Sequence, residues 1–177
     1  PKHIVAFDWL VKHEEYTQMK TGCYLFEPQD DLRTAVRRLK LGWQSPVRIV
    51  VPSVRTMDRL AQSLSKQLMA SEEEILSYLT NPTQIDSLGY TLATLPSLII
   101  PNTYEVYWNV SVADLLARFQ KEYTAYWNDA RKAKAQAQGL TPLEVSTLAS
   151  IVERESSSGS ESFDVASGVV GIFDTSI

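Results

Sequence analysis

The segment from Thr141 to Glu155 predicts an amphipathic helix with a well-defined start. Thr141 is a typical N-cap, Pro142 fits the first helical position, and Glu144 completes a capping box. At about 100° per residue, one side of this helix collects four apolar residues, namely Val145, Leu148, Ile151 and Val152. With 177 residues, the chain is long enough to form a real core.

A carboxylate lies on the apolar stripe of this helix. Glu155 follows Ile151 by four residues and shares its side, whereas Glu153 points to roughly the opposite side. A carboxyl group on an apolar face is costly to ionise, so we expect its pKa to rise, which suits a general acid at neutral pH. A glutamate in a last helical turn can equally be solvated and without function. Glu155 is the best candidate for chemistry, and both interpretations stay open.

The composition is that of an ordinary globular protein with one or two small domains. Hydrophobic residues make up 44% and charged residues 21%, and the formal net charge is −4. We expect no nucleic-acid binding, whereas a neutral or acidic glycan is compatible with this charge. No run approaches the ~20 apolar residues of a membrane span, and no signal peptide is recognised. One basic cluster is interpreted as a solvated helix face and contains Arg33, Arg37, Arg38 and Lys40.

Neither a metal nor a cofactor is expected. Cys23 is the single cysteine, so the chain alone can form neither a disulfide nor a thiolate metal site. His3 and His13 lie in the same predicted helix without the spacing of metal ligands.

Helices and short strands alternate along the chain, which predicts an α+β fold with two small lobes. The predicted strands cover residues 22–26, 47–51 and 103–108. The predicted helices before residue 140 cover residues 4–19, 32–39, 56–68, 71–79 and 112–138. Residues 81–101 are interpreted as a connection, and the alanine-rich end of the long helix is expected to project from the body, with Gly139 as its C-cap. Residues 156–162 have the composition of a linker, and residues 163–177 could add a strand or two.

One block of sequence resembles a known family specifically. Leu148-Ala-Ser-Ile-Val-Glu-Arg-Glu155, preceded by Gly139-Leu-Thr-Pro142, resembles the catalytic helix of the endolytic murein transglycosylases of the MltG (YceG-like) family.

Three further blocks agree in the right order. Lys20-Thr-Gly-Cys-Tyr24 followed by Pro28 is similar to the family's K-x-G-x-Y-x-x-x-P strand. Val51-Pro-Ser-Val-Arg-Thr56 is similar to its LysM-like segment, and Pro101-Asn-Thr-Tyr104 to its P-D-T-Y segment. The resemblance spans roughly residues 3–155.

The resemblance implies a lyase that cleaves peptidoglycan glycan strands between N-acetylmuramic acid and N-acetylglucosamine. The family's acid maps to Glu155, while Tyr104 and Glu153 are assigned to substrate binding, Glu153 being also the second choice for the acid. As an acid, Glu155 would protonate the glycosidic oxygen; as a base, it would take the proton of the C6 hydroxyl that closes onto C1. The product has a 1,6-anhydro end. No water is consumed, so the second carboxylate of hydrolases is unnecessary.

The resemblance also implies a layout and a location. An N-terminal region with a LysM-like segment is expected over residues 1–95, and a transglycosylase domain, incomplete relative to the family, over residues 96–177. Family members are tethered by a single span to the inner membrane with the domain on the periplasmic side, and cell-wall synthases are candidate partners. The chain starts at Pro1, so we expect a fragment from which an anchor has been removed.

The chain departs from the family pattern after Glu155. Family members continue with a helix, an N-R-L segment and a Q-S-D-P-T segment that help to build the sugar cleft, whereas a serine-rich stretch follows here. We therefore expect the chain to be truncated or divergent at this point, which leaves its own activity open. Asn102 in place of the family's Asp is a smaller departure, because Asn can also cap or turn.

A non-catalytic peptidoglycan-binding or scaffold domain is the alternative function. Sugar faces stack on aromatic rings, and the candidate rings are those of Tyr24, Trp43, Tyr104, Tyr107 and Trp108. We expect Tyr24 and Trp43 to be core or edge-strand residues. Tyr104 is the better candidate for a sugar cleft because it lies in the P-N-T-Y segment.

Overall fold

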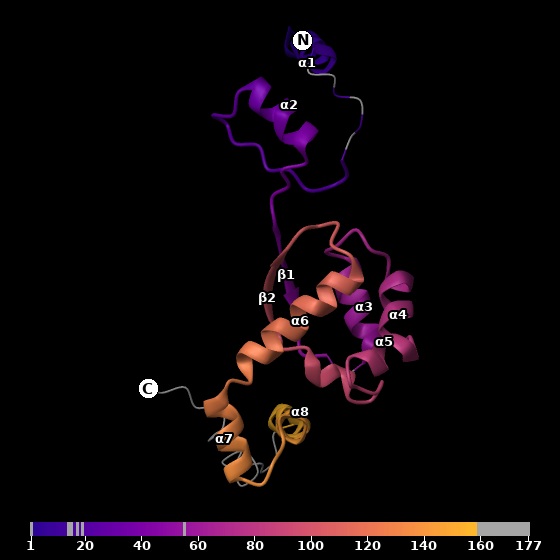
Figure 1. Cartoon of the computed structure of the whole chain (residues 1–177), viewed down its shortest axis with the longest axis vertical. Helices are drawn as coiled ribbons and strands as arrows, with labels where there is room; N and C mark the ends of the chain where they lie inside the picture. The colour runs from indigo at the N-terminus through magenta and orange to yellow at the C-terminus, as the bar shows by residue number, and fades with distance from the viewer. Residues whose placement is uncertain (1, 14–15, 17, 19, 55, 159–177) are drawn as a thin grey trace. The chain divides into compact units, whose positions relative to one another are not determined.

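Helices make up most of the described part of the chain, which also contains one small sheet (Figure 1). The computed structural model describes residues 2–13, 16, 18, 20–54 and 56–158, and of residues 2, 3 and 152–158 it describes the backbone only. The α+β prediction is confirmed in a coarse form, as a mostly helical fold with a two-stranded antiparallel sheet. In chain order the elements are α1 (Lys2–His13), α2 (Leu32–Leu41), β1 (Val47–Val51), α3 (Met57–Ser65), α4 (Glu72–Leu79), α5 (Pro82–Ser87), the 3₁₀ helix η1 (Leu95–Leu98), β2 (Asn102–Val106), α6 (Val112–Tyr126), α7 (Asp129–Ala137) and α8 (Pro142–Ser158).

The chain forms two compact units, each assembled from several segments. The first contains residues 1–52, 58–78 and 101–115, and the second contains residues 53–57, 79–100 and 116–177. Because these units interleave along the chain, they do not test the predicted functional boundary after residue 95, which stays a prediction.

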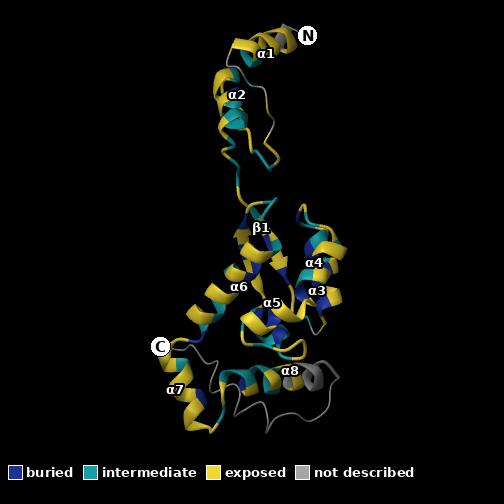
Figure 2. Cartoon of the chain, turned by 45° about the vertical axis from the view of Figure 1, so that its right-hand side comes forward, coloured by how far each residue is buried: buried dark blue, intermediate teal, exposed yellow. Residues whose placement is uncertain are grey.

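The sheet belongs to the first unit and has one buried face. β1 and β2 pair antiparallel, with Val47 opposite Val106 and Ile49 opposite Tyr104. The buried face carries Ile49, Val51, Tyr104 and Val106, each less than a tenth exposed (Figure 2). On the other face, Arg48 pairs with Glu105 across the strands at 3.0 Å, in an exposed position where an ion pair adds little stability.

A side chain covers the edge of β1. The backbone N–H of Val50 donates to Oε1 of Gln67 at 2.8 Å, and Nε2 of Gln67 donates back to the Val50 carbonyl at 3.0 Å. This pairing satisfies backbone groups that an edge strand would otherwise present to a second chain. The first unit also buries apolar side chains from α3 and α4, which include Leu60, Ala61, Leu64 and Ile75.

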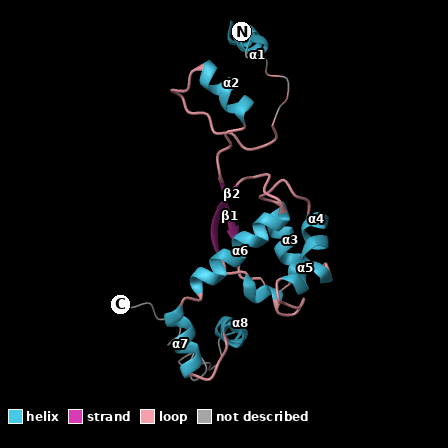
Figure 3. Ribbon diagram, in the orientation of Figure 1, coloured by secondary structure: helices cyan, strands magenta, loops and turns pink. Residues whose placement is uncertain are grey.

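The strand predicted over residues 22–26 is wrong. The segment is drawn as a loop in Figure 3 because no second strand lies alongside it within the described residues. It bonds instead to Ser45, whose N–H donates to the Cys23 carbonyl at 2.8 Å and whose Oγ accepts the Leu25 N–H at 3.1 Å. Gly22 lies so close to the Gln44 side chain that a Cβ there would require this side chain to move.

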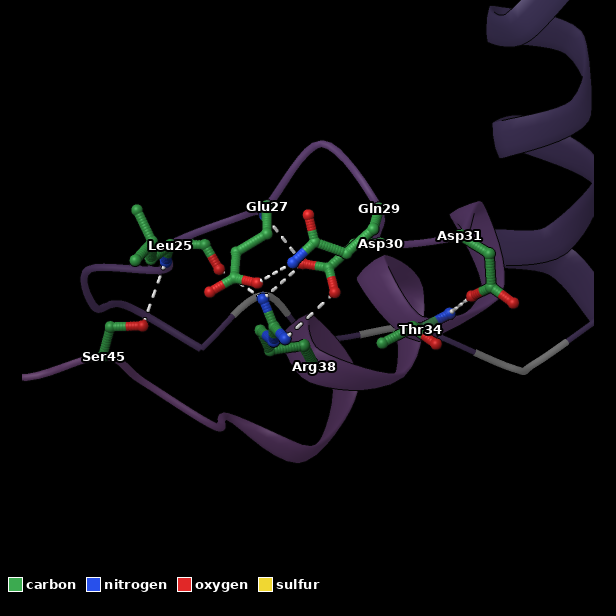
Figure 4. Close-up of polar contacts among 8 residues, drawn as sticks. All are labelled: Leu25, Glu27, Gln29, Asp30, Asp31, Thr34, Arg38 and Ser45. Carbon is green, nitrogen blue, oxygen red and sulfur yellow. Dashed lines mark hydrogen bonds and ion pairs between the residues drawn. The ribbon is translucent and has the colours of Figure 1, made fainter.

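The loop that follows is fastened to α2 by Arg38 (Figure 4). Nη1 of Arg38 donates to Oδ2 of Asp30 at 2.8 Å and also to the Leu25 carbonyl, and both partners of the ion pair are less than a quarter exposed. Asp30 in turn accepts the Glu27 N–H at 2.9 Å. Asp31 caps α2 by accepting the Thr34 N–H at 2.6 Å, and hydrogen bonding to the Thr34 side chain, together with this backbone bond, lowers the pKa of the Asp31 carboxyl.

Two predictions for the middle of the chain are corrected. Residues 81–101 are more than a connection, because Asn81 caps α5 by accepting the Thr83 N–H at 3.0 Å and because Ile85, Leu95 and Leu98 are buried. The long helix predicted over residues 112–138 is broken into α6 and α7. The break occurs at Asn128, whose side chain accepts the Arg131 N–H at 3.0 Å and starts a new helix.

Both ends of the chain also differ from the prediction. The first helix ends at His13 rather than at residue 19, and Tyr16, which is not helical, donates its N–H to the Val11 carbonyl. At the other end, α8 continues to Ser158, so the first serines of the expected linker are helical. The strand or two expected over residues 163–177 falls outside the described residues.

Candidate functional site

The start of α8 is fixed as the sequence predicts. The Thr141 N–H donates to Oε2 of Glu144 at 2.7 Å, and the Glu144 N–H donates to Oγ1 of Thr141 at 3.3 Å, which forms the capping box. The Glu144 carboxylate also accepts the Thr141 hydroxyl at 2.8 Å, and its pKa is lowered because it accepts both the N–H and the O–H of Thr141. Gly139 precedes the cap with a φ of +71°, which suits glycine after the end of α7 and confirms its role in ending that helix.

The first turns of α8 pack against an aromatic cluster. Val145 forms a buried group with Trp127 and Ala135, and Tyr123, Tyr126 and Leu140 pack against this group. Helix α7 contacts α8 here. The expectation that the alanine-rich segment projects from the body is therefore wrong, because Ala135 is fully buried against Trp127 and Val145.

One arginine and several tyrosines lie at the edge of this cluster. The Arg131 guanidinium lies over the Tyr126 ring, and the Tyr90 and Tyr123 rings meet edge to face with centroids 6.4 Å apart. Burial raises the pKa of the Tyr123 hydroxyl, with a further contribution from Tyr90, and burial also raises the pKa of Tyr126. Both phenols are protonated at neutral pH, as phenols with an ordinary pKa are, and they can donate hydrogen bonds or stack on a ligand.

The two candidate acids lie in the last turns of α8. The backbone of Glu153 and of Glu155 is helical, as predicted, whereas their side chains are outside the described residues. One turn earlier, Ile151 is 48% exposed, although Val145 at the start of the same stripe is fully buried. The stripe is thus buried at its beginning and open at Ile151. A raised pKa for Glu155 and a role for Glu153 stay predictions.

The candidate aromatic residues differ in exposure. Tyr104 is 1% exposed and lies in β2, where its ring forms part of the buried sheet face, and its contact with a sugar stays a prediction. Tyr24 is half-buried and donates its hydroxyl to the Lys20 carbonyl at 2.9 Å, but it lies in a loop and not in a strand. Trp43 is 60% exposed, so the expectation that it is a core or edge-strand residue is wrong. Tyr107 is 53% exposed.

Two residues in the cluster were not anticipated from the sequence. Trp127 is its largest buried side chain, and Asn128 ends α6 beside it. The signal for Asn128 is local, because Asn followed by Asp129 is a typical N-cap and first-turn pair. The apolar residues before and after Asn128 both follow a helical period, so the sequence predicted one continuous helix and the cap at Asn128 was missed.

The described residues contain no group of three or more His, Cys, Asp or Glu side chains that could hold a metal ion. His13 stacks on Trp9 with ring centroids 4.9 Å apart. Within the same part of the chain, no helix has both the length and the apolar character needed to cross a membrane.

This chain is similar to known proteins in both sequence and fold. A sequence identity of 24% over 185 aligned positions relates it to the endolytic murein transglycosylases of two strains of Streptococcus pneumoniae, one of them serotype 2. The alignment covers 87% of this chain and 32% of each relative, so the chain spans about a third of the length of these proteins.

The fold is similar to that of a yceG-like protein from Listeria monocytogenes, whose crystal structure was solved at 2.6 Å. The TM-score is 0.54 with 21% identity, and the match covers 91% of this chain and 57% of that one. In addition, the sequence model of the YceG-like family matches residues 2–170. Because this match covers nearly the whole chain, the protein belongs to the YceG-like family.

Proposed function

We propose that this chain carries the acid and base of an endolytic peptidoglycan transglycosylase, and that Glu155 is that residue. The observation that carries the proposal is the family match over residues 2–170, which includes the whole of α8. The relatives named endolytic murein transglycosylases support it, since the chain aligns with them over 87% of its length. The position of Glu155 on the stripe of Val145 and Leu148 supports the choice of this acid over Glu153.

The proposed reaction needs one carboxyl group. Glu155, protonated, donates to the glycosidic oxygen, and the bond between that oxygen and C1 of N-acetylmuramic acid breaks. The C6 hydroxyl of the same sugar then forms a bond to C1 and gives its proton to the Glu155 carboxylate. The acid is restored, no water is consumed, and the new chain end is a 1,6-anhydro sugar. In this proposal the protein acts on nascent strands at the periplasmic face of the inner membrane, with cell-wall synthases as partners.

Product analysis tests this proposal directly. Purified peptidoglycan strands are incubated with the chain, with Glu155→Gln and with Glu153→Gln, and the products are identified by mass spectrometry. Glu153→Gln is the comparison, because it makes the same change in the same helix on the opposite side, at a residue assigned to substrate binding and not to proton transfer. We expect anhydro-ended fragments from the chain, the same fragments at a lower rate from Glu153→Gln, and none from Glu155→Gln. Circular dichroism checks that all three proteins are folded.

Other outcomes would contradict parts of the proposal. Anhydro products from Glu155→Gln would remove Glu155 from the reaction, and a selective loss in Glu153→Gln would transfer the role to Glu153. Products without anhydro ends would indicate hydrolysis.

Glycan binding without catalysis is the second candidate, and one observation favours it. Trp43 and Tyr107 are 60% and 53% exposed, so their rings are accessible for stacking on sugar faces. In that case no protein in the series releases fragments, whereas the chain still sediments with insoluble peptidoglycan. Trp43→Ala and Tyr107→Ala would then weaken the sedimentation.

A further inference from the structure

Exposed hydrophobic side chains are concentrated near the beginning of the chain. Of the thirteen large hydrophobic residues that are exposed within the described part, eight lie between Ile4 and Trp43. Single exposed hydrophobic residues are common in soluble proteins, whereas a group of them usually marks a binding surface. In Figure 2, α1 is accordingly drawn largely in the colour of exposed residues, whereas α2 is drawn in the colours of both exposed and intermediate residues.

Four of these residues form one patch around Arg38. We call it the Trp43 patch; it consists of Leu25, Phe26, Leu41 and Trp43, which are 62%, 45%, 44% and 60% exposed. Arg38 donates to the Leu25 carbonyl, and its guanidinium lies 5.8 Å from the centroid of the Phe26 ring. Its own carbonyl accepts the Trp43 N–H at 3.0 Å. Leu41 is separated from Trp43 only by Gly42, which ends α2 with a φ of +72°.

An ion pair and hydrogen bonds within the protein fix the segments that carry the patch. The Arg38–Asp30 ion pair fixes the loop that carries Leu25 and Phe26 (Figure 4). On the other side, Ser45 bonds to Cys23 and Leu25, which fixes the segment after Trp43. A partner therefore gains apolar contact at little cost in ordering the chain.

Positive charge accompanies the patch. Residues 20–45 contain five Lys and Arg against three Asp and Glu, a net charge of +2 in a chain whose total is −4. Arg33 and Arg37 are exposed on α2, and Leu41 follows Arg37 by one helical turn on the same side. Lys20 extends to the end of α2, where its Nζ donates to the Leu41 carbonyl at 3.3 Å. A partner complementary to this face is anionic and also apolar.

We propose that the Trp43 patch docks on the surface of an anionic lipid bilayer. Such a surface offers phosphate groups to Arg33 and Arg37 and hydrocarbon to Leu25 and Trp43 at the same time. A soluble polyanion would satisfy only the cations and would leave the four apolar side chains in water. The indole of Trp43 also suits this boundary, because it combines an apolar body with a polar N–H. This inference is independent of the transglycosylase activity.

Vesicle sedimentation with the whole chain tests the proposal. Vesicles of an equal mixture of phosphatidylglycerol and phosphatidylcholine are compared with vesicles of phosphatidylcholine alone. We expect binding to the anionic vesicles, which weakens as salt is added. Leu25→Ala with Trp43→Ala removes two apolar contacts and should lower the partition coefficient by about tenfold or more. Arg33→Glu with Arg37→Glu should abolish the preference for anionic vesicles.

A matched control keeps the result specific to the patch. Leu92→Ala with Tyr107→Ala also removes one aliphatic and one aromatic exposed side chain, but both lie outside residues 20–45. This control should bind vesicles as the unchanged chain does. All substituted residues are exposed, so folding should be preserved, which circular dichroism verifies.

Four results would overturn the proposal. The chain could bind neither kind of vesicle, or the Leu92/Tyr107 control could lose as much binding as the patch variant. Third, light scattering could show a dimer that dissociates in the Leu25/Trp43 variant while vesicle binding is unchanged, which would assign the patch to a second copy of the chain. A loss of peptidoglycan sedimentation alone in that variant would likewise assign Trp43 to sugar.

Discussion

The Arg131 guanidinium lies over the Tyr126 ring, with Cζ 4.3 Å from the ring centroid, and its Nη1 donates to the Tyr126 carbonyl at 2.8 Å. One side chain of α7 thus binds both the last residue of α6 and that residue's ring. We expect Arg131→Ala to lower the free energy of unfolding by about 1 kcal/mol, because it removes a cation–π contact and a hydrogen bond. Urea denaturation measures this, with exposed Lys132→Ala as control. Equal effects of the two substitutions would contradict the assignment.

Trp127 is the largest side chain of the buried cluster beside α8. Trp127→Ala should lower the free energy of unfolding by about 3–5 kcal/mol, because it leaves a cavity between Ala135 and Val145. Trp127→Phe should cost clearly less, because the buried indole Nε1 has no hydrogen-bond partner among the described residues and its loss removes a desolvated polar group. Thermal unfolding of both variants distinguishes these effects. A phenylalanine variant as unstable as the alanine variant would contradict this expectation.

The capping box of α8 makes stability depend on pH. The folded state lowers the pKa of Glu144 through the two Thr141 bonds, so the carboxylate favours folding above its unfolded pKa. This contribution should be lost as pH falls through the lowered pKa of the folded state. We expect Glu144→Gln to flatten the acid limb of stability between neutral and acidic pH, as measured by circular dichroism. Glu73→Gln is the control, because it lies in the first turn of α4 and takes no part in this box. An unchanged acid limb in Glu144→Gln would exclude the box as its source.

Arg38 fastens the loop from Leu25 to Asp30. Arg38→Ala should lower the free energy of unfolding by about 1–2 kcal/mol, since it leaves Asp30 half-buried without its cation. Hydrogen exchange of the Glu27 and Asp30 amides should accelerate, because their bonds close this loop. Neighbouring Arg37→Ala, which is exposed on α2, serves as control. Unchanged exchange rates in Arg38→Ala would mean that the hydrogen bonds within the loop are sufficient to keep it in place without Arg38.

Local signals in the sequence predicted the starts of several elements. Ser71 and Thr141 begin helices through capping boxes, because each box needs only residues within one turn. Residues 47–51 form β1 as predicted. The helix that carries Glu153 and Glu155 is likewise formed. The chain belongs to the family that the sequence of this helix resembles.

Predictions failed where the outcome depends on distant residues. Residues 22–26 have the composition of a strand, but a strand needs a partner, and Ser45 supplies isolated bonds instead of a ladder. Tyr104 follows the same logic, since its burial is decided by the sheet face it shares with Ile49. Trp43 directly follows Gly42, where α2 ends with a positive φ, and it is exposed, which composition does not reveal.

Because α8 is packed at Val145, a small tilt of the helix about this residue produces a larger displacement at its far end. Glu155 is ten residues further on, about 15 Å along the axis, so a tilt of about 10° about Val145 would displace its backbone by about 2.5 Å. A shift of this size separates a productive proton transfer from an unproductive one. Whatever supports the far half of α8 would therefore determine how well the proposed acid is aligned.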